Sequence, residues 1–199
     1  MTRRGGNDRK LPVHRDPAHP GFIMDDSNES ERGGHMKVLV AYYSQTGNTE
    51  KVARAIHDSL TTQKEILPVA EVKNRNGYDL VFCGFPVQAH SVPGKMADFI
   101  KALPRGQKVA FFATHGSLRG GPLPRQAFEG ATALAVNQKI LGKFGCRGKV
   151  DAKIIDALMK KPEHQAWAEE AMSAEGHPDA ADLKDACLFA QEMIDWAVG

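Results

Sequence analysis

The sequence predicts a three-layer α/β domain in which helices cover both faces of a parallel β-sheet. Short continuous apolar runs, typical of strands that are buried on both faces, alternate along the chain with segments whose apolar residues recur at helical spacing. The chain has 199 residues and no internal repeat, which suits one well-buried domain. Strands that alternate with helices in this way form parallel sheets.

Five strands are predicted. Val38–Tyr43 and Leu80–Phe85 are strong because both are continuous apolar runs. Val109–Ala113 is a further run of this kind, Ile140–Phe144 is a shorter fifth strand, and Ile66–Val69 is a weak second strand.

The segments between and after these strands predict helices. They cover Val52–Leu60, Pro93–Leu103, an Ala-rich stretch at Arg125–Val136, the short Asp151–Met159, and a last helix that Pro178 opens. Their apolar stripes consist of Val52, Ile56 and Leu60, then Met96, Phe99, Ile100 and Leu103, and finally Leu183, Cys187, Ala190 and Ile194.

Composition narrows the class of protein. The formal net charge is only +2, and no Lys/Arg cluster recurs on one face, so nucleic acid is not an expected partner. No stretch approaches the roughly 20 apolar residues that span a bilayer, so no membrane insertion is expected. Cys83, Cys146 and Cys187 are widely spaced, which favours reduced thiols and a cytoplasmic protein. The pair Arg3-Arg4 lacks the apolar segment that an export signal needs.

Residues 1–35 differ from the rest of the chain because they are rich in Gly, Pro, Asp, Asn and Arg. This composition predicts a flexible N-terminal extension, with the folded domain over residues 36–199. Two alternatives stay open. Met36 could be the natural start, or the segment could be an arm that docks on a partner or a second subunit through Phe22 and Ile23.

The segment S-Q-T-G-N-T, which follows the first strand, predicts an anion site. Ser44, Thr46 and Thr49 offer hydroxyl donors, Asn48 offers an amide, and Gly47 lets the backbone approach a ligand closely. The helix that follows directs free N–H groups at the same point. The absence of Lys and Arg from the loop favours a single phosphate over a triphosphate. The alternative is a helix N-terminus that is rich in capping residues.

The run V-L-V-A-Y-Y-S-Q-T-G-N-T-E-K-V-A resembles the opening of flavodoxins, and the resemblance extends from Met36 to the C-terminus. It implies a flavodoxin-like fold, a five-stranded parallel sheet in the order 2-1-3-4-5, and FMN as cofactor. Leu141–Asp151 is similar to a segment of small bacterial flavodoxin-domain proteins. The residues that the resemblance implies for the FMN phosphate are Ser44, Thr46, Asn48 and Thr49 through side chains, and Gln45 and Gly47 through backbone N–H groups.

Two further loops fall where flavodoxins place the flavin ring. The implied ring contacts are Pro86, Val87, Gln88, Ala89 and His90 after the third strand, and Thr114, His115, Gly116 and Leu118 after the fourth. His90 and His115 are the candidates for hydrogen bonding to the flavin or for proton delivery, although both could be ordinary loop histidines. Well-known flavodoxins hold the ring between aromatic side chains, whereas these loops lack Trp and Tyr. Besides His90 and His115, Phe85 is the only aromatic ring available to contact the flavin, unless it points into the core.

Several other residues have both a functional and a structural interpretation. Arg119 and Arg125 could meet an anionic substrate or an NADPH phosphate, although lone loop arginines are usually solvated. Cys146 could have a redox role, but an inert buried thiol is the favoured interpretation. Trp167 and Trp196 lie in helical segments and are expected to be packing residues.

Other chemistries fit less well. A receiver domain needs Asp where Ser44 and Pro86 stand, the hydrolase motif G-x-S-x-G is absent, and no cluster has metal-ligand spacing. The predicted function is therefore FMN-dependent electron transfer to a redox partner protein or a small-molecule acceptor. The alternatives are an NAD(P)H-dependent quinone reductase of the same fold and a non-catalytic module that binds a phosphate ligand or a partner. The sequence leaves the oligomeric state open.

Overall fold

The computed structural model describes residues 36–199, so the expectations for residues 1–35 lie outside the described chain. Five strands form one sheet in which all neighbours are parallel, in the order β2-β1-β3-β4-β5. This order confirms the predicted topology. The strands are β1 (Lys37–Tyr42), β2 (Gln63–Pro68), β3 (Leu80–Pro86), β4 (Lys108–His115) and β5 (Lys139–Arg147).

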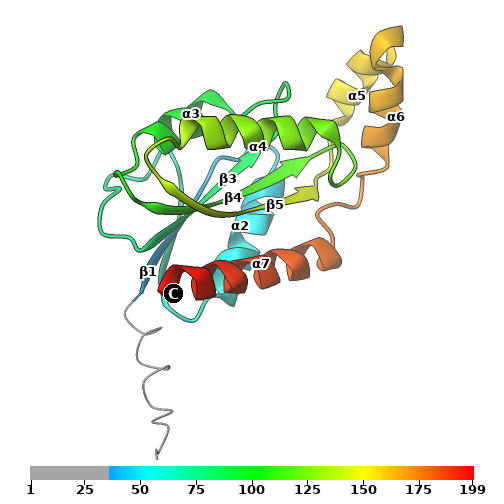
Figure 1. Ribbon diagram of the computed structural model, residues 1–199. Helices are drawn as coiled ribbons and strands as arrows, with labels where there is room; N and C mark the ends of the chain where they lie inside the picture. Colours follow the sequence, from blue (N-terminus) through cyan, green and yellow to red (C-terminus); the bar gives the residue numbers. More distant parts are fainter. Residues whose placement is uncertain (1–35) are drawn as a thin grey trace, which may run out of the picture.

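Helices cover both faces of the sheet, as Figure 1 shows. They are α2 (Asn48–Ser59), α3 (Gly94–Lys101), α4 (Pro122–Leu134), α5 (Ala152–Met159), α6 (Gln165–Met172) and α7 (Ala180–Val198), with a 3₁₀ turn at Pro162–His164. One core lies beneath α2 and α7, and the other lies beneath α3 and α4. Along β1, Val38 and Val40 face the first core, and Leu39 and Ala41 face the second. This alternation is the period of two that a strand imposes.

The boundaries of several elements differ from the predicted ones. The last helix begins at Ala180 rather than at Pro178, because the Asp179 carboxylate accepts the N–H groups of Ala181 and Asp182 and so caps it. Pro93 likewise precedes α3. The strand β5 continues to Arg147, because it pairs with β4 up to His115, with one register shift at Leu141.

The helices α5 and α6 form a pair that stands beyond the sheet, at the end where β4 and β5 terminate (Figure 1). They connect β5 to α7, and α6 contacts the loop that follows β4. None of the helices in residues 36–199 is long and apolar enough to cross a membrane.

Candidate functional site at the carboxyl edge of the sheet

The loop between β1 and α2 presents unsatisfied backbone N–H groups. Gly47 precedes α2 with φ of 86°, a left-handed conformation that glycine adopts without strain. No side chain caps the first turn of α2. Its N–H groups therefore point toward the loop without a side-chain acceptor, and the helix dipole favours an anion there.

The polar side chains of this loop are organised by bonds within it. The Ser44 hydroxyl accepts the Gly47 N–H at 3.1 Å, and the Thr46 hydroxyl accepts the Asn48 amide at 3.2 Å. The same Asn48 amide donates to the Lys149 carbonyl at 2.8 Å. Because Ser44 and Thr46 act as acceptors here, their hydroxyl protons are free to donate to a phosphate oxygen.

The buried Thr49 joins the loop to the fourth strand. Its side chain is only 1% exposed, and its hydroxyl oxygen lies 2.9 Å from that of Thr114. Gly148, after β5, lies so close that a Cβ there would come within 3.2 Å of the Thr114 Cβ and within 3.1 Å of the Asn48 amide nitrogen. This contact could not be predicted from the sequence, since Gly148 lies 100 residues beyond Asn48 and no local pattern distinguishes it.

The loop that follows β3 also meets the β1 loop. The Gln88 amide donates to the Gln45 side-chain oxygen, and the Val87 N–H donates to the Thr114 carbonyl at 2.8 Å. Pro86 pairs with Thr114 in the sheet. The predicted loops after β1, β3 and β4 are therefore brought together at one edge.

A strained turn ends the β3 loop. Ala89 and His90 have φ of 44° and 62°, and backbone bonds between Gln88 and Ser91 close the turn around them. Two consecutive left-handed residues normally require Gly or Asn. Both side chains are exposed, so His90 stays a candidate for a ligand contact.

We expect Ala89→Gly to raise the free energy of unfolding by about 0.5–1 kcal/mol, because glycine adopts the left-handed conformation without a Cβ penalty. Urea denaturation measures the change. Ala97→Gly in α3 is the control: it has no such strain to relieve, and we expect it to lower stability by a similar amount. A loss of stability in Ala89→Gly would contradict the prediction.

The loop that follows β4 lies beneath α6. The Trp167 ring N–H donates to the Ser117 hydroxyl at 3.0 Å, and the Leu118 N–H donates to the Glu170 carboxylate at 2.5 Å. A Cβ on Gly116 would lie 2.5 Å from a methyl carbon of Val150. Helix α6 and Val150 therefore restrict one side of the predicted ring site, a contact that the sequence did not predict.

His115 is buried within this loop. It is 5% exposed, and its Nδ1 lies 2.9 Å from the Ser117 carbonyl oxygen. Burial holds the pKa of His115 below its ordinary value near 6.5, and the charges of Arg147 and Arg119 act in the same direction. The imidazole is therefore neutral at pH 7, with its Nδ1 proton donated to the carbonyl.

This burial predicts a pH-dependent stability. Below about pH 6.5 the unfolded chain binds a proton at His115 more readily than the folded chain, so this contribution to stability is fully present above that pH and falls as the pH decreases. One such group contributes at most about 1.4 kcal/mol per pH unit. Urea midpoints at pH 7.5 and 5 should therefore differ more in the wild type than in His115→Gln. Equal differences would contradict the prediction.

The structure decides several of the alternative interpretations. Phe85 is fully buried and packs edge-on against Phe128 at 6.0 Å, so it belongs to the core. Cys146 is buried, which raises the pKa of its thiol to about 12 and supports an inert thiol. Trp167 packs as expected, but the prediction for Trp196 is wrong because this residue is 55% exposed.

The arginines of the β4 loop differ in their contacts. Arg119 is exposed but not simply solvated, since it forms an ion pair with Asp185 at 2.6 Å and donates to the Gly145 carbonyl at 3.0 Å. Arg125 is exposed on α4.

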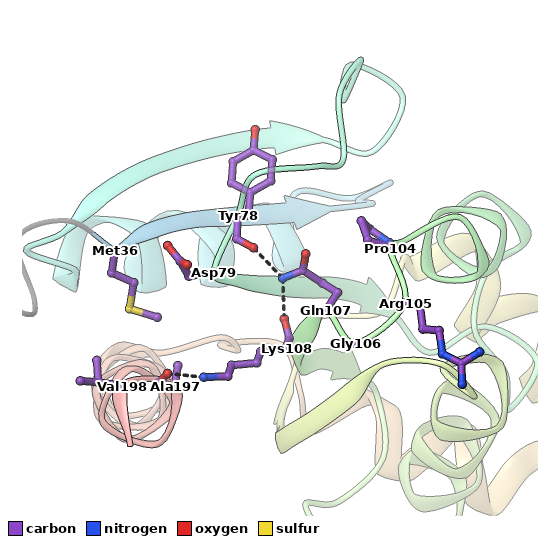
Figure 2. A pocket seen from close by; sticks show the side chains of 10 residues that line it. All are labelled: Met36, Tyr78, Asp79, Pro104, Arg105, Gly106, Gln107, Lys108, Ala197 and Val198. Atoms are coloured by element: carbon purple, nitrogen blue, oxygen red, sulfur yellow. Dashed lines mark hydrogen bonds between the residues drawn. The ribbon is translucent and has the colours of Figure 1, made fainter.

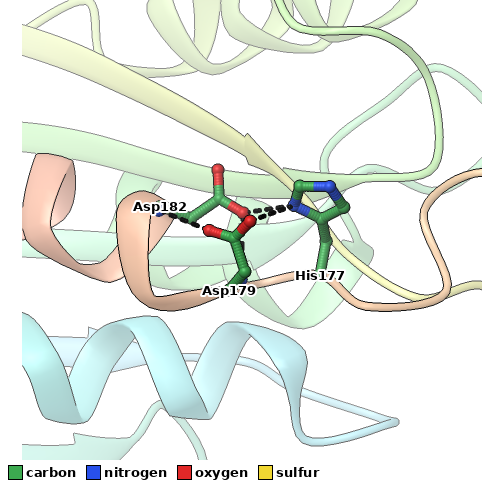
Figure 3. Close-up of side chains that lie close together, drawn as sticks. All are labelled: His177, Asp179 and Asp182. Atoms are coloured by element: carbon green, nitrogen blue, oxygen red, sulfur yellow. Dashed lines mark hydrogen bonds and ion pairs between the residues drawn. The ribbon is translucent and has the colours of Figure 1, made fainter.

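His177, Asp179 and Asp182 come together where α7 begins (Figure 3). The His177 Nδ1 lies 2.5 Å from an Asp182 carboxylate oxygen, and that oxygen also accepts the Asp179 N–H at 3.1 Å. The Asp179 carboxylate in turn accepts the N–H of Asp182. These bonds form a capping box, so the cluster has a structural explanation. In the sequence, the spacing Asp-x-x-Asp directly before an apolar run indicates such a capping box.

A cavity of about 620 Å³ lies at the opposite end of the sheet. As Figure 2 shows, it is surrounded by residues at the amino ends of strands and near the end of α7, among them Met36, Asp79, Lys108 and Ala197. The Lys108 ammonium donates to the Ala197 carbonyl at 2.5 Å. Open α/β sheets bind ligands beyond the carboxyl ends of their strands, so this cavity is not the predicted cofactor site.

Comparisons with solved structures match the fold. A short-chain flavodoxin associated with a PDU bacterial microcompartment superposes with a TM-score of 0.57 at 12% identity, over 81% of this chain and 99% of that one. A flavodoxin from the domain Archaea gives 0.54 at 15% identity, over 81% and 99%. Rubredoxin oxygen:oxidoreductase from Desulfovibrio gigas gives 0.54 at 16% identity, over 84% of this chain and 37% of that one.

Sequence comparisons establish the family as well as the fold. The chain is 30% identical over 171 residues to the flavodoxin-like domain-containing protein BilS of Clostridioides difficile (strain CD3), which covers 80% of this chain and 97% of that protein. A family model described as the flavodoxin domain matches residues 39–191, from β1 into α7. With its parallel sheet in the order 2-1-3-4-5, this chain belongs to the flavodoxin domain family.

Proposed function

We propose that this protein binds FMN through the β1–α2 loop and serves in electron transfer. The observation that carries the proposal is the uncapped first turn of α2 behind Gly47, which leaves backbone N–H groups for an anion. Ser44 and Thr46 add hydroxyl protons that no hydrogen bond within residues 36–199 uses. When bound, the flavin supplies the redox chemistry, and the protein supplies binding and orientation.

The donor set favours one phosphate group. The segment Ser44–Thr49 contains no Lys or Arg, so a single phosphate receives hydrogen bonds without a full balancing charge. The ring contacts that we propose come from residues 86–90 after β3, where Gln88 already contacts Gln45. After β4, Thr114 bonds to Thr49, which joins the fourth strand to the phosphate loop.

Titration of the purified protein with FMN and with riboflavin tests the proposal. We expect quenching of FMN fluorescence and an absorbance band near about 450 nm, which is a property of the flavin itself. Riboflavin lacks the phosphate, so we expect it to bind at least about 100-fold more weakly. Equal affinity for the two would contradict the phosphate site. A colourless protein that quenches neither would instead support the non-catalytic module.

A second candidate is an NAD(P)H-dependent quinone reductase of the same fold. The burial of Phe85 favours this candidate. With Phe85 in the core, His90 is the only aromatic side chain of residues 85–91 that is exposed and could cover the flavin ring. A less covered ring leaves more room for a small substrate. Steady-state oxidation of NAD(P)H with a quinone separates the two candidate functions, because an electron carrier should show almost no such activity.

We propose that the partner of this protein is a redox protein or a small-molecule electron acceptor in the cytoplasm.

A further inference from the structure

A second cavity, of about 420 Å³, lies between the start of α4 and the edge strand β5. Its size falls within the range of small-molecule sites in proteins. It is on the face of the sheet that α3 and α4 cover, because His115 continues the alternation of Phe111 and Ala113 along β4. The phosphate loop precedes α2, which covers the other face.

The buried imidazole of His115 lines this cavity. Its Nδ1 proton is held by the Ser117 carbonyl, so the Nε2 atom carries a lone pair and acts as an acceptor. Within residues 36–199, Nε2 has no hydrogen-bond partner. This atom faces the open cavity, so its lone pair is available to a donor on a ligand.

Gly145 and Phe128 shape the interior. A Cβ on Gly145 would lie 3.2 Å from the His115 Nε2 and 3.3 Å from the Phe128 ring, so the glycine keeps both groups open to the cavity. The Phe128 ring supplies an apolar wall on which a planar ligand can stack. The pocket therefore combines an aromatic surface with one imidazole acceptor that faces the cavity.

Charged side chains surround this interior. Arg125 and Lys143 line the cavity from α4 and β5, and both are exposed. Within the described chain, neither forms an ion pair. Glu129 is the one acidic residue of the lining. Two cations against one carboxylate favour an anionic group on the ligand.

We propose that this cavity binds a small planar carboxylic acid that carries a hydroxyl or N–H donor on its ring. The ring packs against Phe128, the donor bonds to the Nε2 of His115, and the carboxylate lies near Arg125 and Lys143. None of these residues belongs to the β1–α2 or β3–α3 loop, and His115 is the one residue of this set that the flavodoxin resemblance also implies as a ring contact.

Titration of the full chain with 4-hydroxybenzoate, followed by calorimetry and by ¹⁵N NMR of the histidines, tests this proposal. We expect saturable binding that shifts the His115 ring nitrogens. We expect 4-methoxybenzoate to bind at least about 5-fold more weakly, because it lacks the donor. This comparison changes the ligand only and leaves the fold intact.

Variants at the exposed cations test the carboxylate contact. Arg125→Ala and Lys143→Ala should each weaken binding of 4-hydroxybenzoate about 5- to 10-fold. Lys139→Ala is the matched control, because Lys139 is an exposed cation of the same strand outside the cavity, and it should bind like the wild type. Three results would each overturn the proposal: no saturation up to about 10 mM, equal binding of the methoxy acid, or unchanged affinity in both variants.

Discussion

Replacing Ser44 and Thr46 together by alanine is expected to raise the Kd for FMN about 100-fold. In the folded loop, both hydroxyls accept bonds from their neighbours and keep their protons for an outside acceptor. Hydrogen bonds to a charged group contribute about 1.5–3 kcal/mol each, and about 1.4 kcal/mol corresponds to a tenfold change in Kd. Non-additivity between neighbouring donors brings the expected total to about two orders of magnitude.

Fluorescence quenching of FMN measures this change in Kd. Two controls, one a variant and the other a ligand, test whether the change is specific to the phosphate contacts. Ser59→Ala removes a hydroxyl at the other end of α2, where it bonds to the Ile56 carbonyl, and should leave FMN binding unchanged. The affinity of the Ser44/Thr46 variant for riboflavin should match that of the wild type, because the lost contacts concern the phosphate. If the double variant binds FMN as tightly as the wild type, the phosphate lies elsewhere.

Gly84→Ala is expected to lower the free energy of unfolding by about 3 kcal/mol or more, because the added methyl group overpacks the core. Gly84 lies in β3 between β1 and β4, and a Cβ there would lie 2.0 Å from the tip of the Phe112 ring. This ring is fully buried beneath α2 and α7, and in a close-packed core a rigid ring moves aside only if its neighbours move too.

Gly142→Ala provides the matched control for this stability prediction. Its Cβ would meet the sulfur and terminal methyl of Met193, at 2.5 Å and 2.8 Å, and more distantly a ring carbon of Phe189, at 3.2 Å. A methionine end can change rotamer, so we expect a loss of about 1 kcal/mol only. Urea denaturation of both variants compares the two sites. Equal losses would contradict the idea that the rigidity of the neighbour sets the cost.

The layers of the fold follow from short-range patterns in the sequence. Apolar runs such as Val38–Tyr43 and Leu80–Phe85 predicted buried strands, and both occur. The predicted element boundaries were less accurate. The last helix was predicted to begin at Pro178, but the Asp179 side chain caps it and the helix begins at Ala180. Helix ends depend on caps rather than on periodicity, which explains why they were placed less well.

The loop that we propose for the FMN phosphate was likewise predicted from the sequence, because Ser44–Thr49 is one contiguous segment that runs from the end of β1 into the first turn of α2. The chain by itself thus determined the fold class, and, through the flavodoxin resemblance, the strand order. Only the tertiary structure joined Thr49 to Thr114, placed Gly148 against Asn48, and put α6 over residues 116–118. These contacts link residues tens of positions apart, and no local period or spacing encodes which distant side chains the folded sheet brings together.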